Sequence, residues 1–219
     1  MPSITLLRST AVVVLAVAAL VPAVTPAHAA ATPAIPTFSP AIDPYARYEA
    51  ESGCSPTEKP GPQMLRSILT KTYGTSISTN IVRPCSASSS GHEEGRSLDW
   101  TTSVRVAAQK EMATAFIGWL LAKDGYGSTH AMVRRLGIQY VIWNNRMWRA
   151  YDPGRGWAEY SGCLATAKAG KAYDNACHRN HVHVSFSWDG AYKRTSYATG
   201  YVACPSFPSV PTPAALPTT

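Results

Sequence analysis

Residues 178–187, with the sequence HRNHVHVSFS, constrain the fold of this chain more than any other segment. Side chains of a β-strand alternate between its two faces. The apolar positions then share one face: Val182, Val184 and Phe186. The polar positions share the other face: His181, His183, Ser185 and Ser187. An apolar face packs on a core, whereas buried imidazoles need polar partners. The pattern therefore indicates either a metal or a cleft on the polar face, or a half-exposed sheet whose polar face is solvated.

The N-terminal residues 1–29 are typical of an export signal. Arg8 precedes an apolar run over residues 11–21, and Ala27-His28-Ala29 is a small-x-small cleavage site. The apolar run is shorter than the roughly 20 residues that a membrane span needs. We therefore expect a secreted protein, extracellular or in the cell wall, with no integral membrane span after signal cleavage. An uncleaved signal anchor is the alternative.

Proline-rich segments bound the part of the chain that is expected to fold. Residues 30–45 hold four prolines and residues 205–219 hold five. We expect a linker over 30–45, a domain over 46–204 and a disordered tail over 205–219. The 219 − 29 = 190 residues after the signal are enough for one domain, which we expect to be a monomer.

The cysteines of an exported chain are expected to form disulfides. There are five of them: Cys54, Cys85, Cys163, Cys177 and Cys204. No spacing is Cys-x-x-Cys, which argues against a thiolate zinc site. Taken in chain order, Cys54 pairs with Cys85 and Cys163 with Cys177, and Cys204 is left over, although spacing alone does not fix the pairing.

Apolar residues at three- and four-residue steps predict a long helix over 103–123. Thr101 or Thr102 could cap it, and Asp124-Gly125 would stop it. Shorter helices are expected in three places: from Met64 to Gly74, over 129–136 with Gly137 at the end, and over 189–197.

The remaining regular segments have the composition of strands. Residues 138–143 and 147–148 surround Asn144-Asn145 and predict a hairpin. Residues 181–188 predict a strand, residues 75–85 a strand or an extended segment, and residues 152–180 a loop-rich region. The predicted fold is α+β, a mainly antiparallel sheet with one long packed helix and smaller helices.

A second segment that carries chemistry lies at residues 90–100, SGHEEGRSLDW. His92 and Asp99 lie on either side of Gly95, where the backbone can turn sharply. A catalytic zinc site uses three protein ligands plus water. His92, Asp99 and one histidine of the predicted strand would supply these ligands, so the two segments together predict a zinc site.

The order Ser-x-His-x-x-Gly-x-Ala/Ser-x-Asp, followed far downstream by His-x-His, resembles a known superfamily. It contains lysostaphin-type peptidases, D-alanyl-D-alanine metallopeptidases and hedgehog signalling domains, and the resemblance extends to a group of secreted actinobacterial proteins. The matching positions in this chain are Ser90, His92, Gly95, Ser97, Asp99, His181 and His183. His178 extends the match to the His-x-x-His-x-His form of penicillin-insensitive murein endopeptidases.

The resemblance implies a hedgehog/D-alanyl-D-alanine-peptidase-like fold and a role for each of these residues. The Zn²⁺ ligands would be His92, Asp99 and His183. His181 would be the acid/base, His178 would stabilise an oxyanion or assist proton transfer, and Ser90 would support the loop of His92. Many carboxypeptidase members place a glutamate before the final histidine as the base. No carboxylate occurs at 178–180, which favours a histidine base and leaves open a loss of activity.

The predicted function is that of a secreted zinc metallopeptidase or amidase, a hydrolase acting on cell-wall peptidoglycan peptides. The alternative is a catalytically inactive, zinc-containing wall- or ligand-binding module. The mature charge of 19 − 13 = +6 suits an anionic wall polymer. It also suits a metal-dependent nuclease, but the chain has no phosphate-cradling loop or basic aromatic stripe, so we expect no nucleic acid partner.

Several other residues near these segments have a structural and a functional interpretation. Arg83 and Arg96 could meet a substrate carboxylate, although a solvated surface position is expected for both. Glu93 and Glu94 are expected in a solvated turn. Most of the tryptophans are expected in the core, and His130 in a surface or core role.

Overall fold

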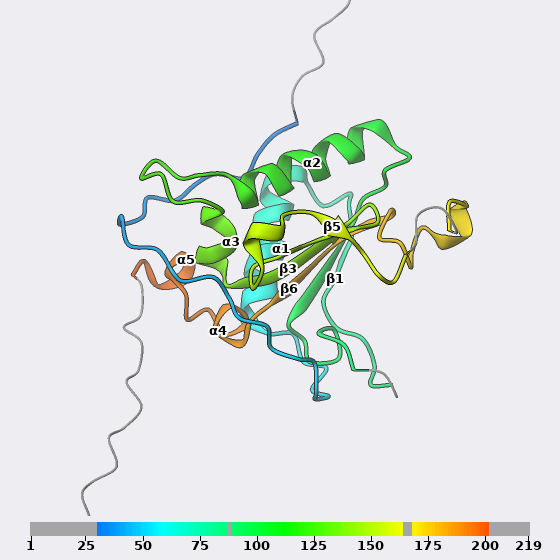
Figure 1. Ribbon diagram of the computed structural model, residues 1–219, viewed down its shortest axis with the longest axis horizontal. Helices are drawn as coiled ribbons and strands as arrows, with labels where there is room; N and C mark the ends of the chain where they lie inside the picture. Colours follow the sequence, from blue (N-terminus) through cyan, green and yellow to red (C-terminus); the bar gives the residue numbers. More distant parts are fainter. Residues whose placement is uncertain (1–29, 87–88, 164–167, 202–219) are drawn as a thin grey trace, which may run out of the picture.

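The computed structural model describes residues 30–86, 89–163 and 168–201. The predicted export signal, Cys204 and the proline-rich tail lie outside these residues. Within them, six strands form one antiparallel sheet in the order β1-β2-β6-β3-β4-β5, and helices pack against it (Figure 1). The fold is therefore α+β, as predicted.

The regular elements have the following bounds. The strands are β1 (Thr79–Asn80), β2 (Ser97–Thr101), β3 (Ile138–Trp143), β4 (Arg146–Arg149), β5 (Ala158–Glu159) and β6 (His181–Phe186). The α-helices are α1 (Pro60–Tyr73), α2 (Ala107–Leu121), α3 (Ala131–Leu136), α4 (Trp188–Ala191) and α5 (Ser196–Thr199). Two 3₁₀ turns, Pro153–Arg155 and Lys171–Tyr173, lie in the loop-rich region.

The central strands have one apolar face, which carries the core. On β6, Val182, Val184 and Phe186 are fully buried in the core, whereas His183 and Ser185 are buried on the other face of the strand, against Asp99 and Ser97. These contacts confirm the alternation of faces predicted for this strand. The three apolar residues belong to one core cluster with Leu65 and Leu69 of α1 and with Phe116 and Leu120 of α2. In Figure 1, α1 crosses the sheet and α2 lies along its upper edge. The helices thus cover the valine face, and the histidine face is left for other contacts.

The hairpin and two of the helices agree with their predictions. Asn144 and Asn145 both have positive φ, as a two-residue turn between β3 and β4 requires. The backbone N–H of Gly74 caps the end of α1, and that of Gly137 caps α3. The long helix is shorter than predicted, since α2 covers Ala107–Leu121. Its N-cap is Val106, so the predicted cap at Thr101 or Thr102 is wrong, and Thr101 belongs to β2.

The prediction of a single helix over 189–197 is wrong. The Oγ atom of Ser187 accepts a hydrogen bond from the backbone N–H of Gly190 and caps the short helix α4. Lys193 then has a φ of 58°, which interrupts the helical path, and α5 starts at Ser196. Ser187 is therefore a capping residue that follows the strand, and it does not extend the polar face of β6.

The proline-rich segment 30–45 has no helix or strand, but part of it packs on the domain. Phe38 is only 9% exposed, and its ring contacts Tyr197 and the guanidinium of Arg135. Asp43 is buried and accepts hydrogen bonds from the backbone N–H and hydroxyl of Ser196. These contacts join the segment to α3 and α5.

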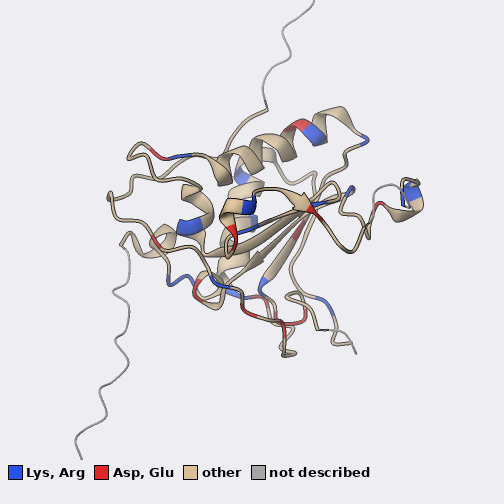
Figure 2. Ribbon diagram, in the orientation of Figure 1, with Lys and Arg blue, Asp and Glu red and all other residues tan. Residues whose placement is uncertain are grey.

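Charged groups show no segregation over the described part of the ribbon. Figure 2 shows Lys and Arg interspersed with Asp and Glu. Among the described residues, no helix has the length and apolar character needed to cross a membrane.

We expect Phe38→Ala to lower the free energy of unfolding by about 2–4 kcal/mol, because it removes a buried aromatic ring. Ile35→Ala is the matched control, since Ile35 lies in the same segment and is 59% exposed. Urea denaturation followed by circular dichroism measures both variants. Equal stability of the two would contradict the packing of this segment.

Candidate metal site

The pairing of β2 with β6 brings two of the predicted ligands together. Asp99 and His183 are direct cross-strand partners, and His181 lies opposite Thr101, two residues further along β2. Partners on one face of an antiparallel pair have Cβ atoms about 4.5–5.5 Å apart. The register of this pair therefore places a carboxylate and an imidazole side by side on the face away from the core.

The third residue, His92, comes from the tight turn that precedes β2. Its backbone N–H donates to Ser90 Oγ at 3.3 Å, which agrees with the supporting role implied for this serine. Gly95 closes the turn with a φ of 69°, and a Cβ atom there would lie 2.0 Å from the carbonyl oxygen of Thr57. The glycine is thus required both by the backbone conformation and by the close approach of another segment.

Three side-chain atoms converge on one point in this arrangement. Asp99 Oδ1 lies 3.1 Å from His92 Nε2 and 2.8 Å from His183 Nδ1, and the two nitrogens are 3.2 Å apart. A tetrahedral metal with bonds of about 2.0–2.1 Å separates its ligand atoms by about 3.3 Å. His92 and His183 are buried, and Asp99 is partly buried. This group could therefore bind a metal ion.

Hydrogen bonding leaves these three atoms short of protons. The Nδ1 atom of His92 lies 2.8 Å from the carbonyl oxygen of Ile81. A carbonyl only accepts, so Nδ1 carries the proton and Nε2 presents a bare lone pair. If both imidazoles are neutral, His183 Nδ1 can carry a proton but His92 Nε2 and Asp99 Oδ1 cannot. The three converging atoms then share at most one proton. A divalent cation satisfies all three, and the Ile81 carbonyl orients His92 as such ligands are commonly oriented.

Asp99 is held in its charged form. Burial alone raises the pKa of a carboxyl group, but the contacts with the imidazoles of His183 and His92 outweigh it and hold the pKa of Asp99 below its usual range. Its second oxygen, Oδ2, lies 3.7 Å from the guanidinium of Arg83, whose side chain is 51% exposed. One carboxylate oxygen thus faces the imidazoles and the other faces a cation at the rim.

His181 lies beside the ligand group and is oriented by its neighbour. Its Nδ1 donates to Asn180 Oδ1 at 2.7 Å, so its Nε2 is unprotonated and lies 3.5 Å from Asp99 Oδ1. Burial lowers the pKa of His181 to about 4, although Asp99 opposes this shift. At neutral pH this nitrogen is a free base that faces the site.

His178 completes the histidine cluster. Its ring lies 4.6 Å from that of His181 and 5.6 Å from that of His183, centroid to centroid. Burial lowers the pKa of His178 to about 2. Its buried Nδ1 has no hydrogen-bond partner within residues 30–86, 89–163 and 168–201. All four histidines singled out in the sequence therefore line one site.

The charged residues beside His92 differ from their prediction. Arg96 is fully buried, with Nε 2.5 Å from Glu94 Oε2 and Nη1 donating to the Phe186 carbonyl. Glu94 accepts from the backbone N–H groups of Ser52 and Gly53, and Glu93 accepts from Ser86. Both glutamates are buried. The expected solvated positions were wrong, because this turn is covered by the segment around residue 53.

The site opens into a cavity of about 410 Å³ that contains residues with no clear sequence signal. The ring of Tyr140 on β3 stacks on His183 at 5.6 Å between centroids, and Tyr160 meets His178 edge to face at 5.0 Å. Glu51 also lines the cavity. The alternation along β3 could have placed Tyr140 on a polar face, but only its pairing with β6 puts it beside His183.

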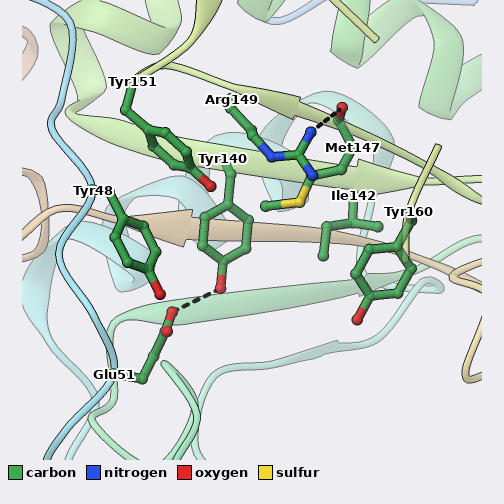
Figure 3. A pocket seen from close by; sticks show the side chains of 8 residues that line it. All are labelled: Tyr48, Glu51, Tyr140, Ile142, Met147, Arg149, Tyr151 and Tyr160. Carbon is green, nitrogen blue, oxygen red and sulfur yellow. Dashed lines mark hydrogen bonds between the residues drawn. The ribbon is translucent and has the colours of Figure 1, made fainter. Parts of the chain in front are cut away.

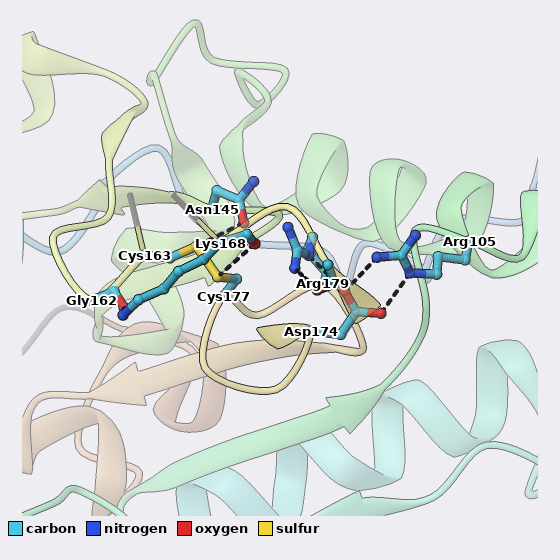
Figure 4. Close-up of a disulfide and its surroundings, with 9 residues drawn as sticks. Arg105, Asn145, Gly162, Cys163, Lys168, Asp174, Cys177 and Arg179 are labelled. Carbon is cyan, nitrogen blue, oxygen red and sulfur yellow. Dashed lines mark hydrogen bonds and ion pairs between the residues drawn. A yellow bond between two sulfur atoms is a disulfide. The ribbon is translucent and has the colours of Figure 1, made fainter. Parts of the chain in front are cut away.

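Two disulfides hold the loops of the site, and they are the pairs expected from chain order. Cys54–Cys85 joins the segment of Glu51 to the approach to His92. Cys163–Cys177, drawn in Figure 4, links the chain next to Tyr160 with the chain next to His178. In the loop between these two cysteines, Asp174 accepts from Arg179 and from Arg105 at 2.6–2.8 Å. Disulfides of this kind fit an oxidising, extracellular environment.

Residues 55–179 match the family described as VldE, C-terminal domain. The chain belongs to this family. The match covers more than half of the chain and includes His92, Asp99 and His178, and it ends before β6 with its two histidines. No curated protein and no solved structure matches the chain.

We expect the purified protein to bind about one divalent metal ion per chain and His183→Ala to weaken this binding by at least about 100-fold, since a ligand is lost. The control is His130→Ala, because His130 contacts Tyr45 and Trp148 and lies outside the cluster. Metal content after dialysis against a graded chelator measures the difference. Equal retention by both variants would exclude this site.

Gly95→Ala should destabilise the protein by at least about 2 kcal/mol, because it combines a left-handed φ with a backbone clash. It should also weaken metal binding, since the turn that carries His92 has to shift. Gly125→Ala is the control, because a Cβ atom there meets nothing within 4 Å. Thermal unfolding and metal titration of the two variants test this, and a neutral Gly95→Ala would contradict it.

Proposed function

We propose that this protein is a secreted, zinc-dependent peptidase or amidase that acts on the peptides of cell-wall peptidoglycan. The observation that carries the proposal is the convergence of His92, Asp99 and His183 beside an unprotonated imidazole, that of His181. Two imidazoles and one carboxylate are a ligand set typical of hydrolytic zinc sites. The motif resemblance to lysostaphin-type and D-alanyl-D-alanine peptidases, with its hedgehog-like fold, supports the same chemistry.

A zinc ion at such a site supplies Lewis-acid chemistry, which polarises a substrate carbonyl and lowers the pKa of a nearby water to about 7. The side chains of this chain would supply the rest. His181 would accept the proton of the attacking water at Nε2 and return it to the leaving amine. Asn180 would hold the imidazole in the tautomer that this transfer requires.

His178 and Tyr160 would shape one wall of the site. The ring of His178 contacts those of Tyr160 and His181, and both His178 and Tyr160 line the cavity. Shielding from water by these rings would strengthen electrostatic interactions inside the cleft. Arg83, at the rim, faces the second oxygen of Asp99 and would leave the first oxygen for the metal.

We expect the mature protein to release peptides from peptidoglycan in a reaction that a chelator abolishes and zinc restores. His181→Ala should lower kcat by about 100-fold or more while metal content stays near one per chain, because it removes the proton acceptor and no ligand. His130→Ala should keep full activity. Chromatography of released peptides measures turnover, and metal analysis accompanies each variant.

Retention of full activity by His181→Ala would refute its role as the base. Metal binding by the wild-type protein with no peptide release, together with retention on wall material, would favour the alternative of a zinc-containing binding module. That alternative is motivated by residues 178–180, which contain no carboxylate base.

A further inference from the structure

A second cavity, of about 310 Å³, adjoins the metal cleft. The two cavities share four lining residues: Glu51, Tyr140, Ile142 and Tyr160. A substrate whose scissile bond lies at the histidine cluster would therefore extend a neighbouring group into the second cavity. His92, Asp99 and His183 do not line this second cavity. A group bound there would therefore determine which substrates are accepted.

The walls of this cavity are aromatic. Four tyrosines line it, and Figure 3 shows their side chains around a common space: Tyr48, Tyr140, Tyr151 and Tyr160. Tyr48 and Tyr151 meet edge to face, with ring centroids 5.1 Å apart. Aromatic faces of this kind attract cations and pack against aliphatic chains.

Two opposite charges face the same space from the two ends of Tyr140. Glu51 Oε1 accepts from the Tyr140 hydroxyl at 2.8 Å. Arg149 is the cross-strand partner of Tyr140, so it lies at the backbone end of that residue. Figure 3 shows the carboxylate and the guanidinium on opposite sides of the ring.

Neither charge is matched by a close ion pair. Within the described part of the chain, the nearest cation to Glu51 is Arg96 Nη2 at 3.9 Å, and Arg96 is already paired with Glu94 at 2.5 Å. Arg149 has no carboxylate within 4.0 Å among the described residues. Its Nη1 donates to the Met147 carbonyl at 3.4 Å, and its guanidinium also interacts with the Tyr151 hydroxyl, which leaves further donors of its five free for a ligand. A carboxylate and a guanidinium with capacity to spare suit a ligand that carries both charges.

We propose that this cavity binds an α-amino-acid zwitterion, with Glu51 accepting from the ammonium group and Arg149 donating to the carboxylate. The next step rests on the proposed function. If the protein cuts wall peptides, the zwitterion would be the free side-chain end of a diaminodicarboxylic acid residue next to the scissile bond. The tyrosines would contact the aliphatic part of that side chain. An ammonium alone would leave Arg149 unmatched, and a carboxylate alone would leave Glu51 unmatched.

Three probes with the same carbon chain test the proposal on the metal-loaded protein: norvaline, pentylamine and pentanoate. Their affinities are measured by NMR titration, with the tyrosine ring signals reporting the place of binding. Norvaline should bind at least about tenfold more tightly than either of the others, since each charge adds a hydrogen bond to a charged group. Equal binding of pentylamine and norvaline would overturn the proposal.

Variants separate the two charges. Glu51→Gln should lower the affinity for norvaline and pentylamine by about tenfold. Arg149→Met should lower the affinity for norvaline and pentanoate by a similar factor. The controls are Glu159→Gln and Arg146→Met, which lie on β5 and β4 outside the cavity. If Arg149→Met leaves the affinity for pentanoate unchanged, pentanoate binds at the metal and not in this cavity. That result would contradict the proposal.

A kinetic experiment distinguishes this proposal from the proposed function. Amidation of the diamino residue's free carboxylate in a wall peptide should raise KM by about tenfold for the wild type and leave KM unchanged for Arg149→Met. If no wall peptide is hydrolysed, the proposed function fails while the probe titrations still decide the cavity. If hydrolysis occurs with no effect of amidation on KM, the zwitterion site fails alone.

Discussion

The antiparallel pairing of β2 with β6 is the constraint on which the site depends. Its register sets Asp99 against His183, and the alternation of side chains puts both on the face that the helices do not cover. A shift of one residue would turn the histidines of β6 into the core and the valines toward the cleft. The burial of Val182, Val184 and Phe186 therefore fixes the place of the histidines, since the core and the site share one strand.

The loops around this strand pair are held by covalent and ionic links. One disulfide ties the segment of Glu51 to the approach to His92, and the other closes the loop between the chain next to Tyr160 and the chain next to His178. Asp174, bound by two arginines, fixes the same loop in front of β6. These links stabilise segments that have little regular structure, and they bring side chains from distant parts of the chain to one cleft.

The electrostatics of the cleft agree with a bound cation. Burial keeps His178 and His183 neutral, and the contacts to histidines keep Asp99 charged. The arrangement therefore concentrates lone pairs, with few protons to satisfy them, around Asp99 Oδ1. Arg83 is half exposed and faces the other oxygen of Asp99, Oδ2. It therefore lies away from the negative charge at Oδ1, where the imidazoles converge.

The sequence by itself determined the alternation of β6, the hairpin at Asn144-Asn145, the ends of α1 and α3, and the residue types of the ligand set, because these depend on local spacing and backbone preference. It did not determine that Glu93, Glu94 and Arg96 are buried, since a distant segment covers their turn. Only the tertiary structure placed Tyr140 on His183, oriented His181 through Asn180, and joined Glu51 and Arg149 at one cavity. These contacts depend on which strands are neighbours and in what register, and register is set by burial over the whole sheet, which no short segment contains.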